Sequence, residues 1–235
     1  MHSPAGTRGA IAFVVAASSE WKVVRARFPD ATVEMSPYGE WFEHRLSEDA
    51  RQTSVFFQSG CGKVAAAGAT QYAIDRCAPR LVVNVGTCGG FGDARVGDIV
   101  LARETVIYDI VEQMGDPAQA IADYSTKLDV SLWPEALRDR VRVERMLSAD
   151  RDLVLAEVPR LREEFQGVTA DWESGAIAWV CARNRTPVLV LRVVTDVMTE
   201  EGNPTYGNIS VFHGAAKTYM TDLLSLAAAA VAHIA

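Results

Sequence analysis

The composition of this 235-residue chain, with 49% hydrophobic and 23% charged residues, is that of a globular protein and excludes a disordered or collagen-like chain. The formal net charge is −7, from 30 acidic and 23 basic residues. The sequence shows no stripe of basic residues, so we do not expect a nucleic-acid partner. A small-molecule partner is expected instead. The length fits a single domain over residues 1–235, with residues 1–9 as a flexible extension.

The four cysteines, Cys61, Cys77, Cys88 and Cys181, are widely spaced and form no C-x-x-C pair. This spacing argues against a disulfide framework and a structural zinc site, and it favours reduced thiols in the cytoplasm. We expect no metal and no cofactor. The most apolar long stretch, residues 223–235, has 13 residues and is too short to span a bilayer, so no membrane partner is expected.

The hydrophobic pattern predicts strands that alternate with helices. The first apolar run, residues 11–16, follows Arg8 and faintly resembles the core of a signal peptide, but we expect a buried first strand. Further strands are predicted at 41–46, 53–58, 81–85, 98–101, 105–109, 141–147 and 188–193. Helices are predicted at 19–28, 63–76, 153–165 with a break at Pro159, 174–184 and within 206–233. Residues 110–133 show no clear helical or strand periodicity of hydrophobic residues and are expected to form an excursion or lid.

This alternation predicts a largely parallel or mixed sheet with helices on both faces. Ligands of such sheets bind where the strands end and the loops turn. The polar and glycine-rich motifs of this chain lie at those predicted strand ends. We therefore examine four of them as parts of one site.

Two glycine-rich segments follow predicted strands. Residues 59–63 (SGCGK) form either a plain strand-to-helix turn or an anion site at a helix N-terminus, and they match neither common nucleotide-binding pattern. Residues 84–90 (NVGTCGG) end a buried strand, and their glycines would let a sugar or ring lie against bare backbone beside the Thr87 hydroxyl. No cationic neighbour lowers the pKa of Cys88, so packing is its expected role.

Two acidic segments follow later strands. In residues 171–176 (DWESGA), Glu173 either caps a helix or accepts hydrogen bonds from the two hydroxyls of a ribose. In residues 192–196 (RVVTD), strand alternation places Arg192, Val194 and Asp196 on one face. A charge inside an apolar strand is costly unless it is paired, so Arg192 indicates either a structural ion pair or a site at the strand end.

The order of these segments resembles the purine nucleosidase and phosphorylase family, and within it the methylthioadenosine/S-adenosylhomocysteine nucleosidases. The matching segments are 11–20 (IAFVVAASSE), 59–67 (SGCGKVAAA), 84–91 (NVGTCGGF), 96–100 (VGDIV), 171–181 (DWESGAIAWVC) and 192–197 (RVVTDV). The resemblance implies an α/β fold, a three-layer α/β/α sandwich around a twisted mixed β-sheet. It also implies a homodimer, which the apolar residues Ile110, Val111, Met114 and Ile121 favour independently.

Two carboxylates carry the chemistry that the resemblance implies. Glu20 falls on the family's acid/base that activates water, and Asp196 falls on the residue that protonates the purine N7. Breaking an N-glycosidic bond produces an oxocarbenium-like sugar and an anionic purine, which suits an acid at N7 and a base on the opposite side. The expected activity is therefore hydrolysis of a purine nucleoside.

The other implied contacts hold the substrate. They are Thr87 and Gly89 at the sugar and base, Glu173 at the ribose hydroxyls with Trp172 beside it, Arg192 near the water and sugar, and Leu153 near the base. Departures from the family pattern leave the base and the 5′ group open. Ala17 and Trp172 stand where bacterial nucleosidases have methionine, and residues 150–153 (DRDL) replace a Phe-Ile pair that stacks on adenine, so an aromatic shelf is missing or comes from elsewhere.

A phosphate site would distinguish a phosphorylase from a hydrolase. Bacterial phosphorylases of the family carry a Gly-Asp-Pro-x-Arg loop and an arginine before the glycine motif, where this chain has residues 16–20 (AASSE) and Asn84. Phosphate would lack bidentate partners here, so water is the expected nucleophile. The alternatives are a purine nucleoside phosphorylase, a futalosine hydrolase-like or hopanoid-linked sibling, and a nucleoside-binding relative without turnover.

Overall fold

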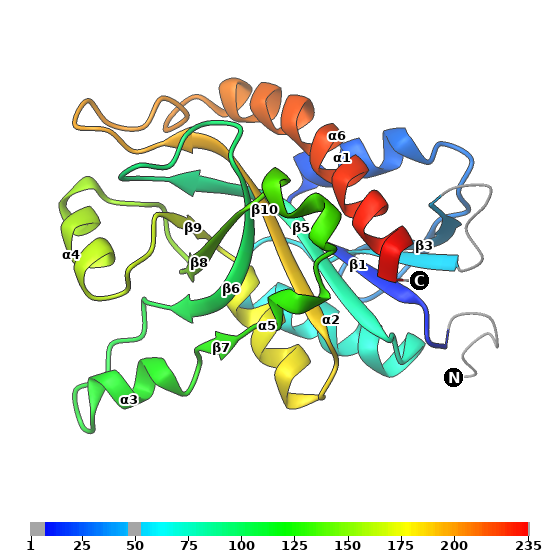
Figure 1. Ribbon diagram of the computed structural model, residues 1–235, viewed down its shortest axis with the longest axis horizontal. Coiled ribbons are helices and arrows are strands. Elements are labelled where there is room, and N and C mark those ends of the chain that lie inside the picture. Colours follow the sequence, from blue (N-terminus) through cyan, green and yellow to red (C-terminus); the bar gives the residue numbers. More distant parts are fainter. Residues whose placement is uncertain (1–7, 47–52, 235) are drawn as a thin grey trace.

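The computed structural model describes residues 8–46 and 53–234, so most of the predicted N-terminal extension lies outside the described residues. In this part of the chain, ten strands join in one sheet (Figure 1). They are β1 (Ile11–Val15), β2 (Glu34–Met35), β3 (Glu40–Arg45), β4 (Thr53–Gln58), β5 (Leu81–Gly90), β6 (Ile99–Ile107), β7 (Thr126–Lys127), β8 (Arg142–Ser148), β9 (Thr169–Asp171) and β10 (Val188–Val197). The buried β1 confirms a first strand in place of a signal-peptide core.

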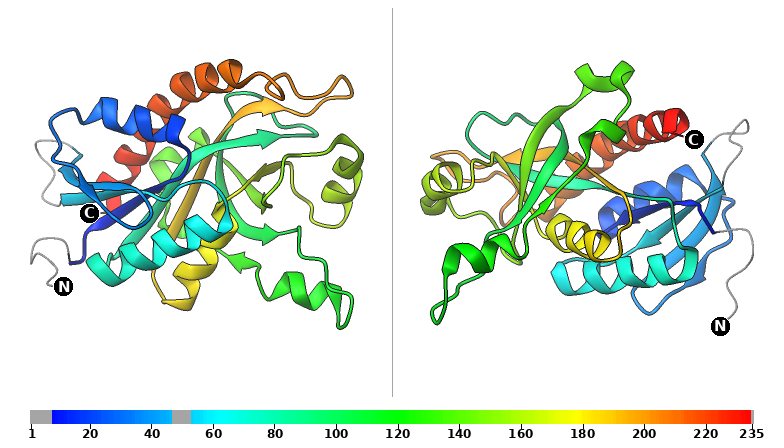
Figure 2. Two further views of the ribbon diagram at one scale, coloured as in Figure 1. Left: turned by 180° about the vertical axis from the view of Figure 1, so that it is seen from behind. Right: turned by 60° about the horizontal axis from the view of Figure 1, so that its bottom comes forward.

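Helices cover both faces of the sheet, as predicted (Figures 1 and 2). The helices α1 (Ser18–Arg27) and α6 (Ile209–Ile234) pack on one face, and α2 (Lys63–Cys77) and α5 (Ser174–Arg183) pack on the other. Apolar side chains fill both interfaces, with Trp21 and Leu223 in the first core and Ala66 and Ile177 in the second. The three-layer α/β/α arrangement is confirmed.

The sheet is mixed and partly closed on itself. The strand order is β10-β6-β8-β9-β5-β1-β4-β3-β2, and β10 also pairs with β5. Strand β5 makes this closure possible because it is long: Leu81–Asn84 pair with β1, Gly89 and Gly90 pair with β9, and β10 runs along most of its length. The pattern of elements predicted the layers but not this ring.

Three strands are longer than the sequence predicts. The predicted strands at 98–101 and 105–109 are one strand, β6, with a register shift between Ala102 and Glu104 against β8. Strand β10 continues to Val197, and β5 continues through its glycine motif to Gly90. Hydrogen bonds from neighbouring strands on both sides outweigh the weak strand propensity of glycine in β5.

One prediction about a helix needs correction, and one about a connecting segment is confirmed. Pro159 does not interrupt a long helix, because it lies in the first turn of the short α4 (Val158–Glu163), where its fixed φ is favourable. Residues 110–133 form an excursion that contains α3 (Pro117–Ala122) and β7. Val111 and Met114 are exposed there, and the homodimer stays a prediction. Among the described residues, no helix is long and apolar enough to cross a membrane.

One glycine of β5 is required by the packing of a buried charge. A Cβ at Gly86 would lie 2.0 Å from Arg192 Nη1 and 3.0 Å from Glu20 Oε1. Both side chains are buried and have little freedom to move. A side chain at this position would therefore displace the arginine from its partners.

We predict that Gly86→Ala lowers the free energy of unfolding by about 3–5 kcal/mol, the typical cost of disrupting a buried ion pair. Urea denaturation followed by circular dichroism measures the change. The control is Gly214→Ala on α6, where a Cβ has nothing within 4 Å and a gain of about 0.5–1 kcal/mol is expected. Equal stability of the two variants would contradict the required close approach.

Candidate active site

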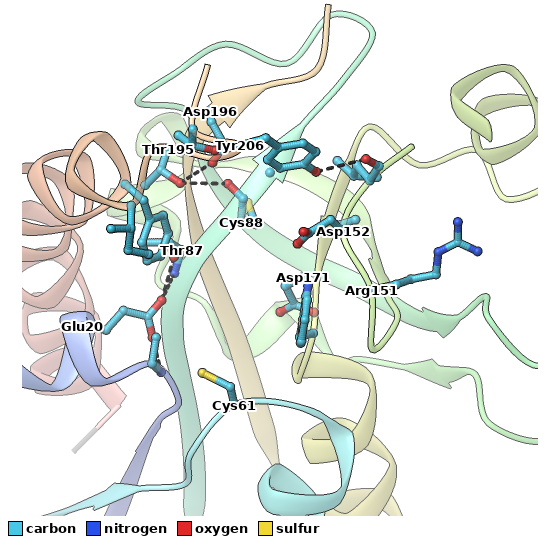
Figure 3. A pocket seen from close by; sticks show the side chains of 18 of the residues that line it. Glu20, Cys61, Thr87, Cys88, Arg151, Asp152, Asp171, Thr195, Asp196 and Tyr206 are labelled. Atoms are coloured by element: carbon cyan, nitrogen blue, oxygen red, sulfur yellow. Dashed lines mark hydrogen bonds between the residues drawn. The ribbon is translucent and has the colours of Figure 1, made fainter. Parts of the chain in front are cut away.

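A cavity of about 610 Å³ opens where β1, β5, β9 and β10 end. Seven of the eight predicted site residues line it: Glu20, Thr87, Gly89, Leu153, Trp172, Glu173 and Asp196. They come from α1, β5, the loop after β8, the β9–α5 junction and β10, and Figure 3 labels Glu20, Thr87 and Asp196 among them. The parallel strands β1, β5 and β10 end at the same edge of the sheet, and β9 reaches this edge by antiparallel pairing with the last residues of β5, which explains how distant segments reach one cavity.

Glu20 is buried at the start of α1 and is held by three donors. The backbone N–H and the hydroxyl of Thr87 donate to Oε1 at 2.6 and 2.7 Å. The backbone N–H of Ala17, the N-cap residue of α1, donates to Oε2 at 3.1 Å. The Thr87 hydroxyl therefore donates its hydrogen atom to Glu20 and can act toward a ligand only as a hydrogen-bond acceptor.

Arg192, the eighth predicted residue, is fully buried in β10 and is not among the residues that line the cavity. Its Nε donates to Asp171 Oδ2 at 2.6 Å, and its Nη2 lies 4.0 Å from Glu173 Oε2. Burial alone would lower the pKa of Arg192, but the carboxylates of Asp171, Glu20 and Glu173 together raise it. The ion pair that the sequence left open is therefore present.

Asp171 organises the junction between β9 and α5. It accepts from Arg192, from the Ser148 hydroxyl at 2.6 Å, and from the backbone and hydroxyl of Ser174 at 3.2 and 2.9 Å. The backbone N–H of Glu173 also points to Asp171, at 3.3 Å. Asp171 thus caps the helix, and Glu173 is left free of the capping role that the sequence allowed.

Glu173 is a buried carboxyl with too few positive neighbours. Its Oε1 accepts from the backbone N–H of Gly62 at 2.9 Å. Burial, and then the charge of Asp171, raises its pKa to about 8, although Arg192 and Gly62 act in the opposite direction. Glu20, Asp171 and Glu173 together surround one guanidinium, so the cluster has more carboxyl groups than positive charges. Binding of a proton or a cation-like group near Glu173 is therefore favoured.

Asp196 reaches the cavity because β10 contains a bulge. The register against β5 shifts between Val194 and Asp196, so the alternation predicted for residues 192–196 is interrupted and Thr195 lines the cavity together with Asp196. Thr195 Oγ1 donates to Asp196 Oδ1 at 2.9 Å, and Asn203 Nδ2 donates to Asp196 Oδ2. Figure 3 shows Asp196 and Glu20 apart on the cavity wall, with Cys88 and Thr87 between them.

Several residues of the cavity were not predicted as site residues. Tyr206 and Phe212 come from the segment after β10 and from α6, and with Trp172 they give the cavity its aromatic surface. Tyr206 also ties this segment to the loop after β8, because its hydroxyl donates to the Leu153 carbonyl at 3.1 Å. An aromatic surface is therefore supplied from elsewhere, as one of the two sequence alternatives states. None of the residues 110–133, all of them described, lines the cavity.

The turn at residues 59–63 is occupied by carboxylates of the protein itself. Gly62 N–H donates to Glu173, and Lys63 N–H donates to Asp150 at 2.8 Å. The Lys63 ammonium is bound by Asp109 and lies 3.6 Å from Asp150. Both the amides and the cation that an anion would need at this helix start are thus already used.

The thiols of the cavity are poor nucleophiles, as the sequence predicts for Cys88. Burial raises the pKa of Cys88 well above its usual range, and the same effect raises that of Cys61 to about 11. Within residues 8–46 and 53–234, no group of three or more His, Cys, Asp or Glu side chains is arranged to hold a metal ion. The buried carboxyl groups of Glu20, Glu173 and Asp196 on the cavity wall are the candidates for proton transfer.

A family model described as the phosphorylase superfamily matches residues 10–232. The chain belongs to the phosphorylase superfamily. This superfamily consists of enzymes that cleave the N-glycosidic bond of nucleosides, as phosphorylases or as nucleosidases. The family resemblance of the sequence is confirmed at this level.

Individual relatives of this superfamily member are nucleosidases. A 5′-methylthioadenosine/S-adenosylhomocysteine nucleosidase of Bacillus pumilus is 31% identical over 229 residues, which cover 91% of this chain and 96% of the relative. The enzyme of that name from Neisseria meningitidis, solved with methylthio-immucillin-A, is 26% identical, covers 96% and 99% of the two chains and has a TM-score of 0.76. A futalosine hydrolase of Helicobacter pylori reaches a TM-score of 0.77 over 94% and 97% of the chains at 19% identity, so the fold alone does not select a substrate.

Because the pKa of Glu173 is raised, the ionised carboxyl group of this residue lowers the stability of the folded protein as the pH rises from about 5 toward 8. The folded protein holds this proton more tightly than the unfolded chain, whose value is near 4.5, so the contribution of Glu173 to stability falls as the pH rises toward 8. We predict that Glu173→Gln gains free energy of unfolding relative to the wild type between about pH 5 and pH 8, by a few kcal/mol. Urea titrations at several pH values measure this difference.

The matched control is Glu163→Gln on α4, where the carboxyl is exposed. Its stability difference from the wild type should not vary with pH over this range. A Glu173→Gln difference that is equally independent of pH would contradict the excess of negative charge around Arg192.

Proposed function

We propose that this protein hydrolyses the N-glycosidic bond of a purine nucleoside, with methylthioadenosine or S-adenosylhomocysteine as the expected substrate. One observation carries the proposal: Glu20, Glu173 and Asp196 are buried carboxyl groups on the wall of a single cavity. The reaction needs a base for water, an acceptor for the ribose hydroxyls and an acid for the leaving purine. Each of these tasks suits one of the three groups.

In the proposed reaction, Glu20 removes a proton from water while the water oxygen bonds to C1′ of the ribose. The electrons of the C1′–N9 bond pass to the purine, and Asp196 delivers a proton to N7. The sugar becomes oxocarbenium-like in the transition state, and the negative charge near Glu173 stabilises it. Each positioned proton transfer is typically worth about 10²–10⁴-fold in rate.

The buried arginine supports the same assignment. Arg192 Nη2 is buried and has no hydrogen-bond partner among the described residues. Buried donors in proteins are nearly always paired with protein or with ordered water. Nη2 lies 4.0 Å from Oε2 of Glu173, a carboxyl group on the cavity wall, so Arg192 would act on the site through Glu173 without lining the cavity itself.

Water is favoured over phosphate because the cavity is acidic. Arg151 is the one Lys or Arg among the described residues that line it, and its guanidinium binds Glu157 at 3.0 Å. Figure 3 shows Arg151 extending away from the other labelled residues. A phosphate dianion would face Glu20, Glu173 and Asp196 without a free cation, which opposes its binding.

The cavity walls support an apolar 5′ substituent and a stacked base. Trp172, Tyr206 and Phe212 offer aromatic surface, and Leu153 and Ala17 add small or aliphatic contacts. Asp152 also lines the cavity and adds a negative charge. We therefore expect alkylthio groups at the 5′ position to be accepted and a 5′-phosphate to be rejected.

A panel of nucleosides tests the proposal. Methylthioadenosine, adenosine, inosine, uridine and adenosine monophosphate are incubated with the protein, with and without phosphate, and free base is measured by chromatography. We predict release of purine that is independent of phosphate, no cleavage of uridine, and poor cleavage of the monophosphate. Phosphate-dependent cleavage with formation of ribose 1-phosphate would show a phosphorylase, and binding of nucleosides without release of base would show a relative that lacks turnover.

The two proton-transfer groups can be removed singly. We predict that Glu20→Gln and Asp196→Asn each lower kcat by at least about 10²-fold, because each removes one positioned proton transfer. Circular dichroism should show that both variants stay folded. Asp139→Asn, on an exposed 3₁₀ turn, is the control with unchanged activity. Near-wild-type turnover in either site variant would exclude that residue from the mechanism.

A further inference from the structure

The segment that follows β10, residues 198–208, is tied to the proposed general acid. Asn203 Nδ2 donates a hydrogen bond to Asp196 Oδ2, while Thr195, inside β10, donates to Oδ1. The segment begins with a tight turn in which Thr199 and Gly202 exchange backbone hydrogen bonds of 3.1 and 2.9 Å. Asp196 is thus held by one donor from its own strand and by one from outside the sheet.

The orientation of the Asn203 amide follows from its other contacts. Its Oδ1 accepts from the backbone N–H of Thr205 at 2.9 Å and from the Thr205 hydroxyl at 2.7 Å. A backbone N–H can only donate, so the atom that faces Thr205 must be the amide oxygen. The NH₂ group therefore faces Asp196 and acts as a donor to its carboxylate.

The oxygen that Asn203 holds lies beside the bare backbone of Gly89. A Cβ at Gly89 would lie 3.5 Å from Asp196 Oδ2 and 3.1 Å from Leu153 Cδ1. Gly89 has no such atom, and it lines the cavity together with Asp196 and Leu153. No side chain at position 89 therefore covers Oδ2, the oxygen that we expect to meet the purine.

We propose that Asn203 is a positioning residue for the general acid, which it orients toward the purine N7 and whose negative charge it stabilises as the proton leaves. This inference rests on the proposed function. As the proton passes from Asp196 to N7, the carboxyl becomes a carboxylate, and a hydrogen bond to a charged acceptor is stronger than one to a neutral group. The Asn203 contact is therefore strongest when the transfer is complete, so its loss should lower kcat more than it raises KM.

Titratable groups that line the cavity together with Asp196 include Cys88 on β5, Asp152 in the loop after β8 and Tyr206 on the same segment as Asn203. Burial raises the pKa of Cys88 well above its usual range and also that of Tyr206, so neither is charged near neutral pH. Asn203 is thus a direct neutral donor to Asp196 that can be removed without altering these groups.

Two substitutions test the donor. Asn203→Ala removes the amide, and Asn203→Asp keeps the acceptor for Thr205 but cannot donate to Asp196 as a carboxylate. We expect each to lower kcat by about 10- to 100-fold, the loss of one hydrogen bond to a charged group, with a much smaller change in KM.

Thr199→Ala is the matched control, since Thr199 Oγ1 donates to Gly202 O at 3.0 Å in the same segment and does not line the cavity. Its kcat and KM should equal those of the wild type. If Thr199→Ala reproduces the loss, or if both Asn203 variants keep wild-type kcat while Asp196→Asn is inactive, the inference is overturned and the proposed function stands.

A binding measurement separates the two proposals. Calorimetric titration with adenine needs no turnover, and we expect its affinity to fall by about tenfold in both Asn203 variants but not in Thr199→Ala. If the wild type cleaves no nucleoside, the proposed hydrolysis fails, and this adenine pattern still supports the role of Asn203 in holding Asp196 at the base. Unchanged adenine affinity in both Asn203 variants would then overturn that role too.

Discussion

The ion pair between Arg192 and Asp171 is the interaction on which the rest of the site depends. Both side chains are almost completely inaccessible, and the Nε–Oδ2 distance is 2.6 Å. Asp171 also caps α5, which sets the position of Glu173, while the guanidinium requires a glycine at position 86 of β5. Removal of either partner would leave an uncompensated buried charge, which typically costs about 3–5 kcal/mol. Sheet, helix start and cavity wall are therefore joined by one contact.

The excess of carboxyl groups around Arg192 suits the proposed reaction but lowers the stability of the folded protein. Burial, and then the negative charge of Asp171, raises the pKa of Glu173 to about 8, so an ionised carboxyl group at this position costs stability. The same excess of negative charge suits a sugar that becomes positively charged in the transition state, and it opposes a phosphate nucleophile. The acidic cavity and the occupied turn at residues 59–63 thus favour hydrolysis for the same electrostatic reason.

The sequence predicted the layers of the fold and seven of the residues that line the cavity, because strand ends carry short ordered motifs. It missed features that depend on contacts distant in the chain. The closure of the sheet around β5, the bulge that brings Thr195 beside Asp196, and the joining of two predicted strands into β6 all arise from pairing between strands. Asn203 and Tyr206 lie in a segment without a motif, so their hydrogen bonds to Asp196 and Leu153 left no signal in the sequence.

A crystal structure of the Asp196→Asn variant with methylthioadenosine tests the central claim most directly, because turnover should be slow enough for the intact nucleoside to remain bound. The account predicts both ribose hydroxyls within hydrogen-bond distance of Glu173, N7 of the base facing residue 196, and a water molecule between C1′ and Glu20. A nucleoside bound with its ribose away from Glu173, or with its base on the Glu20 side of the cavity, would contradict the assignment of the three carboxyl groups.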